Sequence, residues 1–423
     1  MPIRPARLGI VIASAAMTLA AVTAIPVSAL PLSYGLPSTA ARPSPCGAPF
    51  SPAVQRQLRH VITLLRRTYQ IPGVEVGVNV PGQGCWADAS GSANLAAGIP
   101  LSVGSEFPIE SITKTFTATV ILQLVREGKL SLSDPISAWV PSVQDANSIT
   151  VENLLNMTSG IYNEPDPAFE QQLLGDPHMV VTPGQLISAA VAHGPAGPPG
   201  TFSYSNTNYF ILGLIAQEIT GRTIQQLITD QILRPLHLAG TSVPGSTGQL
   251  PASLVHGYQV AAGNATDVTS QYAQFGPELG GAAGAMVSTL GDLERWAYAL
   301  GTGELLTPSL QRQRLTFPAG PAVPFAPLPD TGASTILPGR YGLGIGSFGG
   351  LLGHNGGTTG YQADMFYLPA RNATVVLLIN GSPANGTGSS ANESLADAAA
   401  ISLAEIALGH SLMHTLTQDR RVR

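Results

Sequence analysis

The chain has 423 residues, of which 44% are hydrophobic and 11% are charged, and its formal net charge at pH 7 is −5. This slight acidity, with no cluster of lysine or arginine before residue 420, excludes nucleic acid and anionic membranes as expected partners. The length suggests about two or three domains or lobes, and 47 glycines with 35 prolines suggest many tight loops.

The first 29 residues have the pattern of a secretory signal. Two arginines precede an apolar run that ends near Ile25, and Val27-Ser28-Ala29 follows as a small-residue cleavage site. We therefore expect a secreted or cell-envelope protein whose mature chain starts near Leu30. The apolar run is also long enough for an uncleaved membrane anchor. Residues 30–50, rich in proline, serine and alanine, are expected to be a linker.

Helix and strand patterns follow in a clear order along the rest of the chain. Residues 54–69 predict an amphipathic helix, and residues 74–91 predict a β-hairpin. Further helices are expected at residues 112–127, 151–155, 209–221 and 224–233. Three β-type runs and a closing helix are expected at residues 350–354, 362–368, 374–380 and 393–408. An irregular stretch at residues 162–180 carries acidic side chains that could line a cleft, namely Glu164, Asp166 and Glu170.

The order of these elements predicts an α+β fold. Strands from both ends of the chain would form one antiparallel sheet flanked by helices, an α/β/α sandwich, with an all-helical lobe inserted. The domain is expected to span residues 51–410. Its sheet lobe would consist of residues 51–105 and 285–410, and its helical lobe of residues 106–284. Residues 411–423 would form a polar tail. The proline-rich stretch at residues 317–339 is expected to be an excursion at the surface.

Two cysteines, Cys46 and Cys85, lie near the start of the expected mature chain. Export makes a disulfide between them chemically possible. It would tie the chain before the first helix to the end of the first hairpin.

Ser111 and Lys114 begin the most apolar predicted helix. They lie three residues apart and so share a helix face, and the lysine is expected at the buried end of a core helix. Lys114 and Lys129 are the only lysines in the chain. A desolvated lysine can lose its proton, which arginine cannot, so the serine beside it is a candidate nucleophile. Taken alone, the pair also fits a helix cap with a lysine that reaches solvent.

Two later stretches gather polar side chains beside glycines. Ser203-Tyr204-Ser205-Asn206 offers a phenol and an amide two residues apart. Gly353-His354-Asn355-Gly356-Gly357 ends a strand in glycines that let a ligand approach the backbone closely. Taken separately, the tyrosine and asparagine of the first stretch are typical of an ordinary turn, and the histidine of the second is typical of a side chain packed within a sheet.

Taken together and in this order, the three stretches resemble the S-x-x-K, Y-x-N and K/H-x-G motifs of the penicillin-recognising serine hydrolases. This family includes the class C β-lactamases, the D-alanyl-D-alanine carboxypeptidases and related esterases. The resemblance extends from about Pro108 to Gly360 and includes the connecting segments at residues 149–160 and 284–289. It implies a β-lactamase/transpeptidase-like fold, in agreement with the layout expected from the elements.

The resemblance also implies a role for each motif residue. Ser111 would attack a carbonyl and form an acyl-enzyme, while Lys114 and Tyr204 would share the proton transfers. The implied catalytic residues are Ser111, Lys114, Tyr204 and His354. The implied substrate-binding residues are Asn206, Asn355 and Gly356, and the implied oxyanion hole consists of the backbone N–H groups of Ser111 and Gly357. No metal or cofactor is implied, and His410-x-x-x-His414 is interpreted as solvated surface despite its helical metal-ligand spacing.

These roles predict a D-alanyl-D-alanine carboxypeptidase-like peptidase that acts on cell-wall peptides. The expected substrate is a peptidoglycan stem peptide, a β-lactam or an ester. Histidine at position 354, where β-lactamases usually have lysine, is a weaker anchor for a substrate carboxylate and argues against efficient penicillin hydrolysis. Arg340 could supply a positive charge instead. The alternatives are an esterase or weak class C-like β-lactamase with the same site, and a catalytically silent penicillin-binding or regulatory relative.

Overall fold

The computed structural model describes residues 47–175, 181–244, 250–261, 263–318, 323–325, 337–383, 389–410 and 412. The expected signal, most of the expected linker and nearly all of the expected polar tail lie outside these residues. Export and signal cleavage therefore stay predictions. In the described part of the chain, no helix combines the length and the apolar character that a membrane span requires.

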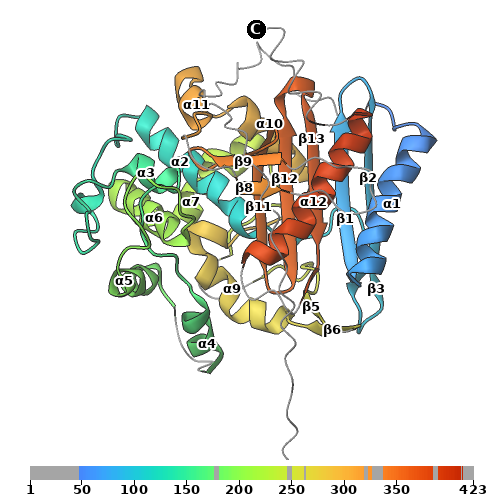
Figure 1. Ribbon diagram of the computed structural model, residues 1–423, viewed down its shortest axis with the longest axis horizontal. Coiled ribbons are helices and arrows are strands. Elements are labelled where there is room, and N and C mark those ends of the chain that lie inside the picture. The colour runs from blue at the N-terminus through green and yellow to red at the C-terminus, as the bar shows by residue number, and fades with distance from the viewer. Residues whose placement is uncertain are drawn as a thin grey trace, which may run out of the picture. The chain divides into compact units, whose positions relative to one another are not determined.

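A nine-stranded sheet forms the centre of the fold (Figure 1). All its neighbouring strands are antiparallel. In spatial order they are β3 (Ile99–Pro100), β2 (Gly84–Asn94), β1 (Gly73–Val80), β13 (Ala373–Ile379), β12 (Tyr361–Leu368), β11 (Leu351–Thr358), β10 (Gly346–Phe348), β9 (Leu337–Tyr341) and β8 (Val323–Phe325). Strands from the N-terminal and C-terminal parts of the described chain meet where β1 pairs with β13, so that Val74 lies opposite Ile379. The prediction of one antiparallel sheet built from both ends is thus confirmed.

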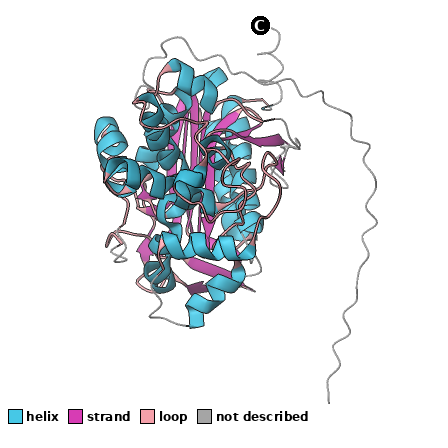
Figure 2. Ribbon diagram, turned by 90° about the vertical axis from the view of Figure 1, so that its left-hand side faces the viewer, coloured by secondary structure: helices cyan, strands magenta, loops and turns pink. Residues whose placement is uncertain are grey.

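Helices cover both faces of this sheet (Figure 2). On one face, α1 (Pro52–Thr68) and α12 (Ser389–Leu408) pack against alternate residues of β13, including Val375 and Leu377. On the other face, Val376 and Leu378 belong to the core that contains α10 (Leu290–Thr302). Because β13 is buried on both faces, it reads as a continuous apolar run rather than an alternating one.

The remaining elements build the inserted lobe or connect the elements of the main sheet. The helices are α2 (Thr113–Arg126), α3 (Val151–Leu155), α4 (Pro167–Gly175), α5 (Pro183–His193), α6 (Asn206–Thr220), α7 (Ile224–Ile228), α8 (Arg234–Leu236), α9 (Thr269–Gly284) and α11 (Pro308–Arg314). The short helical turns are η1 (Glu110–Ile112), η2 (Ile136–Ala138), η3 (Thr229–Leu233) and η4 (Pro369–Arg371). There are two small sheets in the described part of the chain. One has the strand order β14 (Gly381–Pro383), β5 (Tyr258–Ala261) and β6 (Asn264–Asp267). The other pairs β4 (Phe107–Pro108) with β7 (Val287–Ser288). The lobe expected to be all-helical therefore also contains the β5–β6 hairpin.

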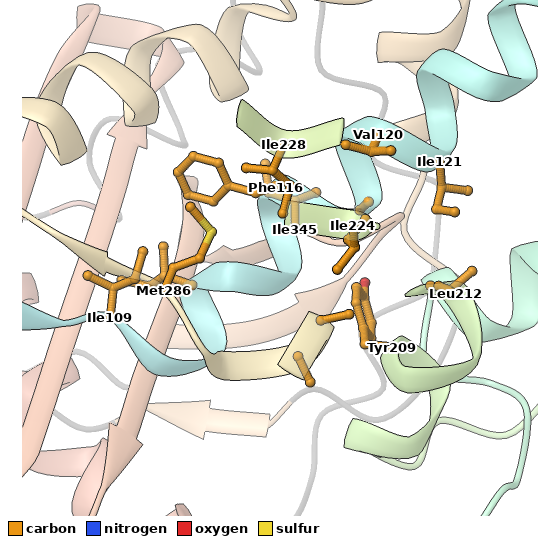
Figure 3. Packing of buried hydrophobic residues seen from close by; sticks show 14 of the residues in the cluster. Ile109, Phe116, Val120, Ile121, Tyr209, Leu212, Ile224, Ile228, Met286 and Ile345 are labelled. Atoms are coloured by element: carbon orange, nitrogen blue, oxygen red, sulfur yellow. The ribbon is translucent and has the colours of Figure 1, made fainter. Parts of the chain in front are cut away.

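Helix α2 runs through the middle of the lobe, and its first twelve residues are buried. Figure 3 shows Phe116, Val120 and Ile121 of this helix packed among side chains of α6 and α7. Phe116 also stacks on Trp296 of α10, with ring centroids 4.3 Å apart. Each such side chain contributes about 1.5–3 kcal/mol on burial, so the helix that follows Ser111 is held rigidly.

The structure also bears on two expectations for segments outside the lobe, the proline-rich stretch and the two cysteines. The proline-rich stretch contributes strands β8 and β9 to the edge of the main sheet, while residues 319–322 and 326–336 lie outside the described part. Cys85 is disulfide-bonded. Because Cys46 lies outside the described residues, the pairing of these two cysteines stays a prediction.

Candidate active site

Ser111 lies in the turn η1, immediately before α2, at the edge of a cleft of about 620 Å³. The segment is fixed by a hydrogen bond from the Ile109 N–H to the Met286 carbonyl, which continues the pairing of β4 with β7. Strand β11 approaches it closely: a Cβ atom at Gly356 would lie 2.4 Å from the Ile109 carbonyl oxygen and 2.9 Å from the Ser111 nitrogen. Glycine at position 356 is therefore required for this strand to reach the serine.

The Ser111 hydroxyl has two close partners. Lys114 Nζ lies 2.8 Å from Ser111 Oγ, and the Tyr204 hydroxyl lies 2.9 Å from the same oxygen. The first contact follows from helical spacing, because residues three apart lie on one face. The second contact joins the turn η1 to the loop before α6. The arrangement gives the serine proton two routes of departure.

Lys114 is fully buried, which the sequence pattern predicted from the apolar helix. Its ammonium group also donates a hydrogen bond to the Ala283 carbonyl at 2.9 Å. The rings of Tyr204 and Tyr209 lie 5.0 and 5.8 Å from Nζ, close enough for cation–π attraction. The lysine is therefore held against the serine by one carbonyl and two rings.

Tyr204 and Asn206 are positioned by the neighbouring loop at residues 157–163. The Ser205 hydroxyl donates to the Tyr162 carbonyl at 3.1 Å, and the Asn206 N–H donates to the Asn163 side-chain oxygen at 2.7 Å. Tyr204 and Asn206 both line the cleft with Ser111. The structure thus brings these predicted residues together.

His354 is buried behind this group rather than exposed in the cleft. Its Nε2 atom lies 2.9 Å from the Tyr341 hydroxyl, and its Nδ1 atom contacts the Asn355 carbonyl. Burial and the charge of Lys114 lower the pKa of His354 to about 3, so the imidazole is neutral at physiological pH. Both ring nitrogens of His354 are therefore engaged by groups other than Ser111, and its ring lies beside that of Tyr204, with the ring centroids 6.4 Å apart.

Asn355 does not join the site, and its expected role in substrate binding is wrong. Successive side chains of β11 point to opposite faces of the sheet. The Asn355 amide lies on the face covered by α12, where it donates to the buried carboxylate of Asp397 at 3.0 and 3.2 Å. Gly357, two residues beyond, does line the cleft beside Ser111. The oxyanion hole from the N–H groups of Ser111 and Gly357 stays a proposal.

The cleft is acidic. Asp166 and Glu170 line it, as the sequence suggested, whereas Glu164 is buried behind the surface. Among the described residues that line the cleft there is no lysine or arginine, and Arg340 is not one of them. The described lining of the cleft therefore offers no cationic side chain to a substrate carboxylate, and the buried ammonium of Lys114 is bonded to Ser111 Oγ and to the Ala283 carbonyl.

Sequence reasoning missed Glu110 and Tyr341. Glu110 lines the cleft directly before the serine, and burial raises its pKa to about 8, so its carboxyl group is largely protonated at neutral pH. Its place next to Ser111 was the available signal. Tyr341 gave no signal, since its contact with His354 depends on how β9 pairs with β10 and β10 with β11.

Known proteins are similar to this chain in sequence and in fold. The protein-family model Beta-lactamase matches residues 57–400. A D-stereospecific amidohydrolase from Streptomyces sp. is 29% identical with a TM-score of 0.64, over 79% of this chain and 95% of that one. The D-amino acid amidase of Ochrobactrum anthropi SV3, solved with L-phenylalanine amide, is 25% identical with a TM-score of 0.68, over 87% and 99%. PbpX of Bacillus subtilis is 34% identical over 131 residues, 31% of each chain, so the match spans about a third of that curated relative.

Proposed function

Because this chain belongs to the beta-lactamase family of serine hydrolases, we propose that it cleaves amide bonds of D-amino acid derivatives through an acyl-enzyme on Ser111. The observation that carries the proposal is the pair of contacts to Ser111 Oγ, at 2.8 Å from Lys114 Nζ and 2.9 Å from the Tyr204 hydroxyl. A serine hydroxyl with an adjacent buried lysine is the arrangement that activated nucleophiles need.

The proposed reaction has two halves. In the first, Ser111 Oγ bonds to the substrate carbonyl carbon, and its proton passes through Lys114 or Tyr204 to the leaving nitrogen as the C–N bond breaks. In the second, water attacks the resulting ester, its proton returns by the same pair to Ser111 Oγ, and the acid leaves. The Ser111 and Gly357 N–H groups would stabilise the oxyanion in both halves.

The charge of the cleft supports an amide with an uncharged leaving group. Asp166 and Glu170 line the cleft, and His354 is neutral. The negative charge of these side chains favours a substrate with a free amino group and disfavours one with a carboxylate beside the scissile bond. The names of two structural relatives, a D-stereospecific amidohydrolase and a D-amino acid amidase, agree with this substrate class.

The D-alanyl-D-alanine carboxypeptidase predicted from the motifs uses the same chemistry but releases an amino acid that bears a carboxylate. One comparison separates the two functions: the same D-alanyl-D-alanine peptide with a free and with an amidated C-terminus. One unfavourable charge contact costs about 1 kcal/mol at 4 Å in water. We therefore expect kcat/KM to be about fivefold or more higher for the amidated peptide. A preference for the free acid would favour the carboxypeptidase.

The proposal as a whole is tested with D- and L-phenylalanine amide, a nitrophenyl ester and the Ser111→Ala variant. We expect hydrolysis of the D-amide, little hydrolysis of the L-amide and none by Ser111→Ala, with the acyl group found on Ser111 by peptide mass spectrometry. Ser102→Ala, at an exposed serine, is the control. Activity that survives Ser111→Ala contradicts the mechanism, and turnover of the ester alone makes the protein an esterase.

A further inference from the structure

A second cluster of chemical groups lies at the rim of the cleft. The carboxylates of Glu164 and Asp166 lie 3.4 and 3.6 Å from His193 Nε2. One atom from each of the three residues lies within 4.8 Å of the other two. A tetrahedral zinc ion, with bonds of about 2.0–2.1 Å, separates its ligand atoms by about 3.3 Å. The spacing of the three side chains therefore fits a single small cation.

The buried carboxylate of Glu164 gives an independent reason to expect a ligand. Its side chain has 0% exposure, and its Oε1 atom, the one nearest His193, has no hydrogen-bond partner. The other oxygen, Oε2, accepts the Asp166 N–H at 2.8 Å. A buried carboxylate oxygen without a partner is costly, and coordination of a metal is one of the two usual remedies.

The groups around the cluster hold it in a geometry suited to coordination. The Tyr162 ring stacks on the His193 ring at 4.3 Å, and the Tyr162 hydroxyl donates to Asp166 Oδ2 at 3.2 Å. Contacts of this kind orient metal ligands in known sites. His193 ends helix α5 with 46% of its side chain exposed, so a cation can reach the cluster from solvent.

We propose that Glu164, Asp166 and His193 bind one divalent transition metal ion, with zinc as the best fit and water completing its coordination. An imidazole with two carboxylates suits zinc or manganese, whereas calcium and magnesium prefer oxygen ligands alone. The family resemblance implies no metal for the reaction, and this ion takes no part in the chemical steps. It would offset the charges of Glu164 and Asp166, so that Glu170 supplies the acidity of the cleft in the metal-bound protein.

The ion would instead brace the rim of the cleft. It joins α5 to the loop at residues 162–166, and that loop holds the start of α6. Within the loop, Asn163 accepts the Asn206 N–H at 2.7 Å, and the Glu164 N–H donates to the Thr207 hydroxyl at 3.1 Å. Binding therefore stabilises the segment that places Asn206 in the cleft.

The test uses the full chain without an affinity tag, freed of metal by a chelator and titrated separately with Zn²⁺, Mn²⁺, Mg²⁺ and Ca²⁺ in a calorimeter. We expect about one Zn²⁺ per chain, a rise in the melting temperature on binding, and much weaker binding of Mg²⁺ and Ca²⁺. His193→Ala should weaken zinc binding by about 100-fold or more. Because His193 is half-exposed, this variant should fold, which circular dichroism checks.

Three controls keep the result specific. Glu164→Gln removes the buried charge and should also weaken zinc binding, whereas His60→Ala and His410→Ala should leave it unchanged. His60 is an exposed histidine on α1, and His410 belongs to the other pair with metal-ligand spacing. The proposal is overturned if zinc does not saturate the wild-type protein, if His193→Ala binds zinc as tightly as the wild type, or if His410→Ala abolishes binding. In those cases His193 contacts the two carboxylates without a metal ion between them.

Discussion

Replacing Tyr204 with phenylalanine removes a single oxygen from the site. That oxygen lies 2.9 Å from Ser111 Oγ, while the ring that remains lies 5.0 Å from Lys114 Nζ and packs edge-on against Tyr341 at 6.3 Å. A side chain that transfers a proton in the transition state contributes about 10²–10⁴-fold to the rate, or about 3–5 kcal/mol of barrier. We expect kcat to fall by this factor in Tyr204→Phe. Because the ring packing is kept, the free energy of unfolding should change by only about 1 kcal/mol.

The assay is rapid-mixing measurement of acylation with a chromogenic substrate, together with urea unfolding of the same preparation. Tyr209→Phe is the matched control, since its ring also faces Lys114 Nζ, at 5.8 Å, but its hydroxyl donates to the Leu155 carbonyl at 3.1 Å. This control should lose some stability and keep its acylation rate. If Tyr204→Phe acylates as fast as the wild type, the hydroxyl transfers no proton and Lys114 acts alone.

Three further predictions concern charge and burial. Lys114→Arg keeps the positive charge but cannot lose a proton, so acylation should slow by about 100-fold or more; a wild-type rate would exclude Lys114 as the base. Asn355→Ala removes the amide that lies 3.0 Å from Asp397. The free energy of unfolding measured in urea should fall by about 1–3 kcal/mol, and kcat/KM should stay unchanged. Loss of activity without loss of stability would instead support a role of Asn355 in substrate binding. Burial raises the pKa of Glu75 and of Glu294 to about 7, from 4.5, so the folded chain holds more protons than the unfolded one near neutrality. The free energy of unfolding should therefore fall as the pH rises from about 4.5 to about 7 and level off above that, and Glu75→Gln should flatten this slope. An increase over that range would contradict the assignment.

Residue spacing was enough to predict the contact of Ser111 with Lys114, because it follows from one turn of helix. The motif order also placed Tyr204 and Asn206 beside them, and hydrophobic pattern alone indicated a sheet made from both ends of the chain. Asn355 shows where motif order stops being informative. It gives the position of a residue along a strand, whereas the pleat decides its face, and His354 and Asn355 necessarily point in opposite directions.

Other features depended on packing that no local pattern expresses. The neutral state of His354 arises from burial and from the charge of Lys114, which lies 240 residues earlier in the sequence. Strands β8 and β9 lie in a stretch rich in proline and glycine, a composition that is typical of loops. They are strands because the edge of the main sheet offers β9 a partner in β10. Pairing of this kind overrides local preference.

The pairing of β1 with β13 also bears on how the protein is made. Val74 lies opposite Ile379, so about 300 residues are synthesised between two strands that become neighbours. Until β13 has left the ribosome, one edge of β1 lacks its final partner, and pairing over such a distance is slow and exposed to aggregation. Strand β11, which approaches Ser111 through Gly356, is also made late. A chain whose translation stops before these strands therefore lacks the frame of its candidate active site.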